Sequence, residues 1–182
     1  DRPMRPLFPK DYRNDVTLEN LVMCVDQDCS PELTAMLGSA LATCISDIPF
    51  DGPTAATQIG LVDGELVINP TSAQRQVSDL ALTVASTREK VIMIEAGANE
   101  VPEDKMIEAI YKAHEVNGQI IEFFDKIVAE CGKEKHEYEH FDIPEDMFED
   151  MVNFITPEAM EEAVFTDVKQ VREENIRQIK DK

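Results

Sequence analysis

The sequence predicts an α+β fold, in which amphipathic helices pack on one face of a β-sheet, followed by a small all-helical segment. Two observations carry this prediction. Alternating apolar runs bounded by turn dipeptides occupy residues 55–95, and apolar residues at three- and four-residue spacing occupy the segments on either side. With 182 residues, of which 43% are hydrophobic, the chain can bury one core and an appendage.

The first two elements are predicted before residue 50. Residues 16–25 alternate loosely and are rich in Val, Leu and Met, which indicates a buried strand. Ser30 and Pro31 then supply an N-cap and a first-turn proline, so we expect a helix of about four turns. Its apolar stripe is Leu33, Met36, Leu37, Ala40, Leu41 and Cys44, and it should end near the turn residues 49–53.

Two hairpins and a long helix come next. Residues 55–69 form the first hairpin, because Asp63-Gly64 is a dipeptide favoured in tight primed turns. Residues 80–85 and 91–95 form the second, with a polar turn between them. Residues 102–131 have a helical apolar period that Gly132 ends.

The last fifty residues are predicted to be a linker and helices. Residues 133–144 are rich in charge and indicate an exposed linker, and residues 144–154 and 156–180 indicate two helices. Their apolar stripe is narrow, so this region should need a partner surface. We therefore expect two domains, residues 1–132 and 133–182.

Charge singles out the first thirteen residues. The formal net charge is −20, so the chain as a whole repels polyanions, yet Arg2, Arg5, Lys10 and Arg13 gather at its start. Three prolines stiffen this segment, and arginine bonds phosphate oxygens in a bidentate manner. The pattern suits contact with an anion and equally suits a surface loop with solvated charges.

Four stretches of the sequence resemble those of the polynucleotide phosphorylase family. They are residues 1–9 (D-R-P-M-R-P-L-F-P), 46–53 (S-D-I-P-F-D-G-P), 60–71 (G-L-V-D-G-E-L-V-I-N-P-T) and 93–97 (M-I-E-A-G). They follow the order found in the family. The chain is thus similar to the later part of the family's first RNase PH-like core and the start of its all-helical domain.

The resemblance implies a fold and an activity. The fold is an RNase PH-like sheet with packed helices, here a partial core whose first strands would precede Asp1, so we expect a piece of a longer protein. The family degrades RNA from the 3′ end with inorganic phosphate, releases nucleoside diphosphates, and can polymerise RNA in reverse. It works as a homotrimeric ring in the cytoplasm. Its Mg²⁺-dependent phosphorolytic site lies in a second core, so we expect no catalytic residue, no metal ligand and no activity from this chain alone.

For RNA contact, the resemblance implies particular residues. Arg2 and Arg5 fall on two positions that touch the RNA backbone in the family, and Arg13 and Lys10 are weaker candidates. Gln58 departs from the family, many members of which carry an arginine at that point of the strand. The predicted role of this chain is ring scaffold and RNA positioning.

Two other functions stay open. The chain could be a non-catalytic RNA-binding or ring-scaffold module, without turnover. It could also be a zinc metallopeptidase, because His136, Glu137 and His140 satisfy H-E-x-x-H and Glu145 or Asp146 could serve as a third ligand. That site needs a helix holding both imidazoles on one face, and the motif lies in the predicted linker, so the peptidase is disfavoured.

The remaining singular residues have structural interpretations. His114 lies in the predicted long helix, at a position that resembles the family's, and a packing role is expected. Cys24, Cys29, Cys44 and Cys131 lack metal-binding spacing, so we expect reduced thiols that are buried or half-buried. No apolar run approaches a membrane span, and we expect a cytoplasmic protein without membrane contact.

Overall fold

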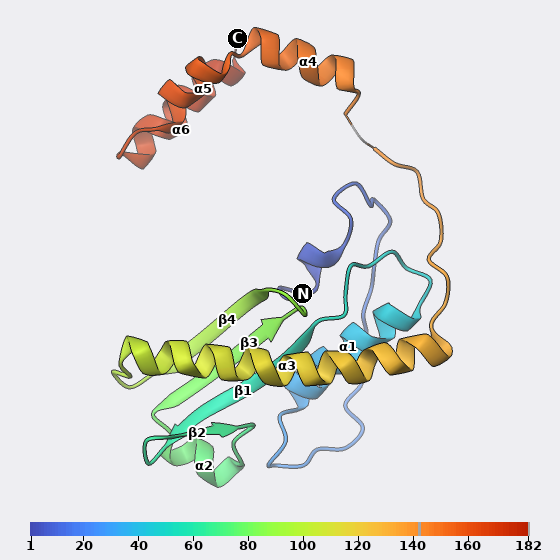
Figure 1. Ribbon diagram of the computed structural model, residues 1–182, viewed down its shortest axis with the longest axis vertical. Coiled ribbons are helices and arrows are strands. Elements are labelled where there is room, and N and C mark those ends of the chain that lie inside the picture. The colour runs from blue at the N-terminus through green and yellow to red at the C-terminus, as the bar shows by residue number, and fades with distance from the viewer. Residues whose placement is uncertain (142, 182) are drawn as a thin grey trace. The chain divides into compact units, whose positions relative to one another are not determined.

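Four antiparallel strands form the sheet of this protein (Figure 1), in a computed structural model that describes residues 1–141 and 143–181. They are β1 (Ala55–Val62), β2 (Glu65–Ile68), β3 (Leu80–Ser86) and β4 (Val91–Ala98), in the spatial order β2-β1-β3-β4. The chain divides into two units, Asp1–Glu139 and His140–Lys182, and the sheet belongs to the first.

Both predicted hairpins are confirmed. Between β1 and β2, Asp63 has a φ of 51° and Gly64 a φ of 81°, the left-handed conformation that a tight primed turn requires. This turn sets a register in which Leu61 faces Leu66. The second hairpin, β3-β4, contains an irregularity next to Ser86, where the register shifts.

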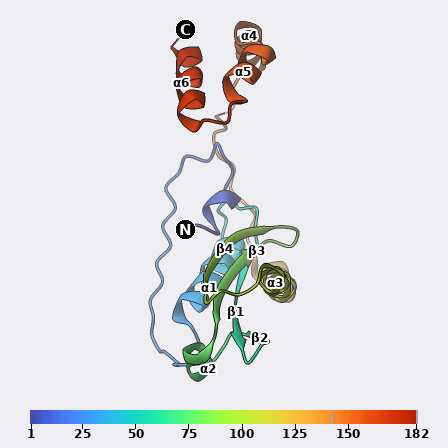
Figure 2. The same ribbon diagram turned by 90° about the vertical axis from the view of Figure 1, so that its left-hand side faces the viewer.

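The helices cover both faces of the sheet, and not one face as expected (Figure 2). Helix α3 (Glu103–Cys131) packs Ala109 and Ala113 against Ile59 and the neighbouring strand residues. Helix α1 (Pro31–Ile45) packs on the opposite face, where Ala56 lies. The burial pattern of β1 explains the difference, because residues of both parities are buried and a central strand covered on both sides needs two layers of helices.

Both helices follow the sequence closely. Helix α1 begins as predicted, since the hydroxyl of Ser30 accepts a hydrogen bond from the amide of Leu33 at 3.2 Å. Helix α3 is fixed to the sheet by a buried amide. The amide nitrogen of Asn117 donates to the carbonyl of Val84 and the hydroxyl of Ser86, and its oxygen accepts from Thr57 at 2.7 Å.

Two short helical elements were not predicted from the sequence. Helix α2 (Ser72–Val77) begins with a capping box, in which Thr71 and Gln74 exchange side-chain and backbone hydrogen bonds. The T-x-x-Q spacing was a readable signal, but the apolar period beside it is too short to predict a helix. A 3-10 turn, η1 (Arg5–Leu7), also forms in the first segment.

The predicted strand at residues 16–25 is wrong. Residues 15–26 have no regular secondary structure, and the side chains of Leu21 and Met23 are 82% and 85% exposed. A strand exists only through hydrogen bonds to a neighbour, and none of the four strands pairs with this segment. An alternating apolar pattern was therefore insufficient.

The second unit is helical, with α4 (Glu145–Phe154), α5 (Pro157–Val164) and α6 (Lys169–Lys180). The single helix predicted for residues 156–180 is wrong, because Phe165 closes α5 by donating its amide to the carbonyl of Glu161. Large apolar side chains are exposed throughout this unit, including Phe148, Phe154 and Phe165. Within the described part of the chain, no helix is both long and apolar enough to cross a membrane.

Candidate nucleic-acid interface

The first nine residues are held to the first unit by their apolar side chains. Met4 is 5% exposed and packs with Cys44 and Phe50, and the ring of Phe8 lies 5.0 Å from that of Phe50. The backbone contributes as well, since the amide of Asp51 donates to the carbonyl of Leu7 at 2.8 Å. The arginine-bearing segment is therefore a packed element.

The two predicted arginines project outward from this packed segment. The side chain of Arg2 is 63% exposed and its guanidinium lies 3.1 Å from a carboxylate oxygen of Glu95 on β4. The side chain of Arg5 is 77% exposed and donates two hydrogen bonds to Asp1, at 2.6 and 3.2 Å. Both guanidiniums thus lie on the surface, each paired with an exposed carboxylate.

The other two cations extend the same stretch of chain. The guanidinium of Arg13 donates to the carbonyl of Lys10 at 3.1 Å, and both residues are exposed. A pocket of about 700 Å³ runs along this stretch and includes Arg5, Lys10 and Tyr12 in its lining. Asp1, Asp11 and Asp15 interrupt the cations, so the local positive charge is modest.

Gln58 and His114 lie elsewhere in the first unit. Gln58 is half-buried in β1, where it pairs with Thr83 of β3, and its neutral side chain supplies no cation. His114 is half-buried on α3, and its Nδ1 is the one buried side-chain nitrogen or oxygen without a hydrogen-bond partner among the residues the structure describes. The structure places His114 on the long helix, as predicted, and its packing role stays a prediction.

The first residues of the predicted linker are docked on the first unit, whereas an exposed linker was expected. Residues 132–141 form no helix, in agreement with the sequence, but residues 133–138 do not extend freely into solvent. The hydroxyl of Tyr12 lies 3.1 Å from Nε2 of His136, and that of Tyr138 donates to Asp11 at 2.9 Å. Sequence reasoning missed these residues because a charge-rich segment carries no signal for where it docks.

The H-E-x-x-H motif does not adopt the form that a zinc peptidase uses. His136, Glu137 and His140 lie in irregular chain, so no helical turn brings two imidazoles to one face. In the described ranges 1–141 and 143–181, no group of three His, Cys, Asp or Glu side chains could hold a metal ion. The three-ligand site that a zinc peptidase needs is therefore lacking in that part of the chain.

The cysteines divide into two kinds. Cys44 is buried, as expected, and burial is the main cause that raises the pKa of its thiol to about 11, against the opposing effect of the Lys135 ammonium. Cys24, Cys29 and Cys131 are exposed, so the prediction that all four are buried or half-buried is wrong for these three. Cys24 is exposed because the strand predicted around it does not form.

The fold defines the class of protein first. Residues 52–116 match the family described as "3′ exoribonuclease family, domain 2", RNase_PH_C. The solved structure of rice (Oryza sativa) Rrp46 is similar with a TM-score of 0.52 and 16% sequence identity, covering 58% of this chain and 51% of that one. These matches confirm the predicted α+β, RNase PH-like fold.

Bacterial relatives then narrow the class to one family. The chain is 78% identical over its whole length to a polyribonucleotide nucleotidyltransferase of Lachnoclostridium phytofermentans, and 48% identical over 181 residues to one of Clostridioides difficile. The resemblance to the polynucleotide phosphorylase family is thereby confirmed. The chain spans about a quarter of the length of these relatives, 26% in both cases.

Proposed function

We propose that this chain forms part of a phosphorolytic exoribonuclease, which shortens RNA from its 3′ end with inorganic phosphate and can extend RNA in reverse. The chain's part in this reaction is structural and electrostatic. It supplies scaffold for a homotrimeric cytoplasmic ring and holds the RNA backbone through Arg2 and Arg5, with Arg13 in a lesser role. The similarity over the whole chain to polyribonucleotide nucleotidyltransferases supports the activity.

One observation carries the proposed RNA contact. Met4 is buried between two arginines whose guanidiniums point to solvent, so the positive charges are held at fixed positions on a rigid segment. Phosphorolysis brings a phosphate ion to a polyanionic strand, and cations must hold both in place. A packed arginine pair of this kind holds phosphates without reading bases.

The ion pairs of Arg2 and Arg5 are compatible with this role. Both pairs are more than half exposed, and exposed pairs contribute only about 0–1 kcal/mol to stability. A phosphate that offers bidentate acceptors can therefore displace Glu95 or Asp1 at small cost. The carboxylates keep the arginines oriented until RNA arrives.

The test uses the complete natural protein, in which the ring can assemble. Changing Arg2 and Arg5 together to Ala should weaken RNA binding about equally for all sequences and reduce the salt slope by roughly one to two counterions. Lys10→Ala with Arg13→Ala is the control and should do less. Wild-type affinity and salt dependence in the Arg2/Arg5 variant, with the trimer intact, would show that these arginines are structural.

A non-catalytic RNA-binding or scaffold module is the second candidate. The resemblance implies that the Mg²⁺ of the proposed reaction is held by the second core of the enzyme, and among the described residues no group of three His, Cys, Asp or Glu side chains could hold a metal ion. The purified chain alone should not release nucleoside diphosphates from poly(A). Turnover by the complete protein separates the enzyme from the module.

A further inference from the structure

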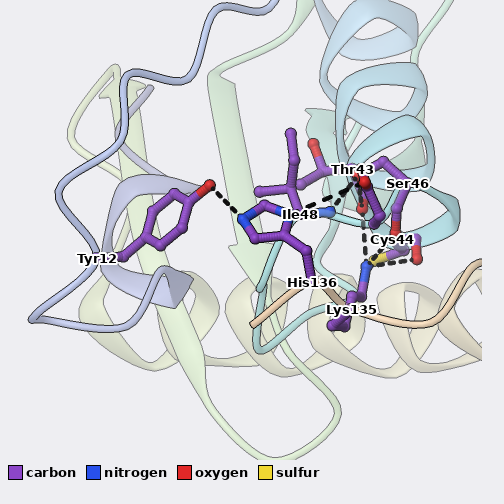
Figure 3. A network of polar contacts seen from close by, with 8 residues as sticks. Tyr12, Thr43, Cys44, Ser46, Ile48, Lys135 and His136 are labelled. Atoms are coloured by element: carbon purple, nitrogen blue, oxygen red, sulfur yellow. Dashed lines mark hydrogen bonds and ion pairs between the residues drawn. The ribbon is translucent and has the colours of Figure 1, made fainter. Parts of the chain in front are cut away.

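The C-terminal end of helix α1 is completed by residues almost ninety positions away in the sequence (Figure 3). The last four carbonyls of a helix lack partners within it. In α1, the amide and hydroxyl of Ser46 bond the carbonyls of Ala42 and Thr43. The carbonyl of Ile45 accepts the amide of Lys133 at 3.0 Å.

Lys135 provides a donor for the remaining carbonyl, that of Cys44, and a positive charge. Its ammonium donates to the carbonyls of Thr43, Cys44 and Ser46 at 3.2, 2.9 and 2.7 Å. The last turn of α1 has no basic residue of its own, so Lys135 is the cation that its negative dipole end favours. The start of the predicted linker is thus bound to α1 by the ammonium of Lys135 and by the backbone amide of Lys133.

Residues 133–138 also bind the N-terminal segment, at Asp11 and Tyr12. The ring of Tyr12 meets that of Tyr138 edge-on with centroids 5.1 Å apart, and it also lies against His136. Both tyrosine hydroxyls are bonded, to His136 and to Asp11. His136 is further tied to the α1-β1 connection, since its amide donates to the carbonyl of Asp47 at 2.8 Å.

We propose that residues 133–138 are a clasp that joins helix α1 to the N-terminal segment and so positions Arg2 and Arg5. Tyr12 and Tyr138 are the positioning residues of this clasp. Two sides of the N-terminal segment are then fixed, because Met4 packs on Cys44 in the last turn of α1 and Tyr12 packs on the clasp. The inference rests on the proposed function, since it concerns how the RNA-contacting arginines are held.

The test removes two hydroxyls and no charge. In the complete natural protein, Tyr12→Phe with Tyr138→Phe keeps both rings but loses the bonds to His136 and Asp11. Hydrogen exchange at the amides of Lys133 and His136 should become about 10-fold faster, while exchange in β1 should not change. RNA affinity should fall about 3- to 10-fold, because a loosened segment must be ordered on binding.

The control is Tyr111→Phe, which removes a hydroxyl from an exposed position on α3 and should change neither measurement. Unchanged exchange at Lys133 and His136 in the double variant would overturn the clasp. Faster exchange with unchanged RNA affinity would overturn its positioning role. If the Arg2/Arg5 variant also binds RNA normally, the proposed RNA contact has failed instead, so the two failures are distinguishable.

Discussion

Two segments of the first unit show the opposite of the burial that their composition predicts. Residues 15–26 are rich in apolar side chains and yet remain irregular, with Leu21 and Met23 almost fully exposed. Residues 133–138 are mostly charged or polar and yet are bound at both ends. Hydrophobicity alone would have predicted the reverse.

The difference shows that unsatisfied backbone groups, as well as apolar side chains, decide where a segment docks. The end of α1 offers carbonyls that need donors, and Lys133 and Lys135 supply them, so a polar segment finds a defined place. Residues 15–26 present amides and carbonyls to no neighbouring strand in the described sheet. Without that ladder, the side chains of Leu21 and Met23 stay in solvent.

The largest expected effect compares one cysteine from each region. Cys24 in the open segment is exposed, whereas Cys44 is buried beside the clasp with the pKa of its thiol raised to about 11. The raised pKa keeps the Cys44 thiol protonated near pH 7, and the thiolate is the reactive form. Mass spectrometry after iodoacetamide treatment should find Cys24 labelled at least about 100-fold faster than Cys44.

Labelling in urea supplies the control for this comparison. Once the chain unfolds, the burial that raises the pKa is gone, so both thiols should react at similar rates. Rapid labelling of Cys44 in the folded protein would mean that the end of α1 opens readily. The contrast between the two regions would then fail.

The next effect concerns the ammonium that closes α1. Lys135→Met removes three hydrogen bonds and leaves the carbonyl of Cys44 without its donor, which should lower the free energy of unfolding by about 1–3 kcal/mol in a urea titration. Lys133→Met removes the same charge nearby and keeps the backbone amide that donates to the carbonyl of Ile45. The Lys133→Met variant should change the free energy of unfolding by no more than about 0.5 kcal/mol. Equal losses in the two variants would show that Lys135 acts through its charge alone and not through its hydrogen bonds.

The smallest effect is expected in the open segment. Leu21→Ser with Met23→Ser should change the free energy of unfolding of the chain by no more than about 0.5 kcal/mol, because both side chains are already in solvent. Leu82→Ala in β3, where the side chain is fully buried, should cost about 2–5 kcal/mol and serves as the reference. A loss of more than about 1 kcal/mol in the first variant would show that residues 15–26 pack after all.

The parts predicted correctly share a local cause. The Asp63-Gly64 turn, the Ser30 cap and the long period of α3 each depend on residues within a few positions of one another, and the structure has all three. The outward arginines Arg2 and Arg5 were also singled out from a local cluster, and their RNA contact stays a prediction.

The sequence by itself determined the hairpins, the helices α1 and α3 and the family resemblance, because turn chemistry, capping and apolar period act over a single turn or strand pair. Only the tertiary structure decided that α1 and α3 take opposite faces, that residues 15–26 pair with none of the four strands and that Lys135 reaches the end of α1. Each of these depends on groups far apart in the chain. Whether a backbone carbonyl meets a donor ninety residues away is set by the packed arrangement, and no local pattern encodes it.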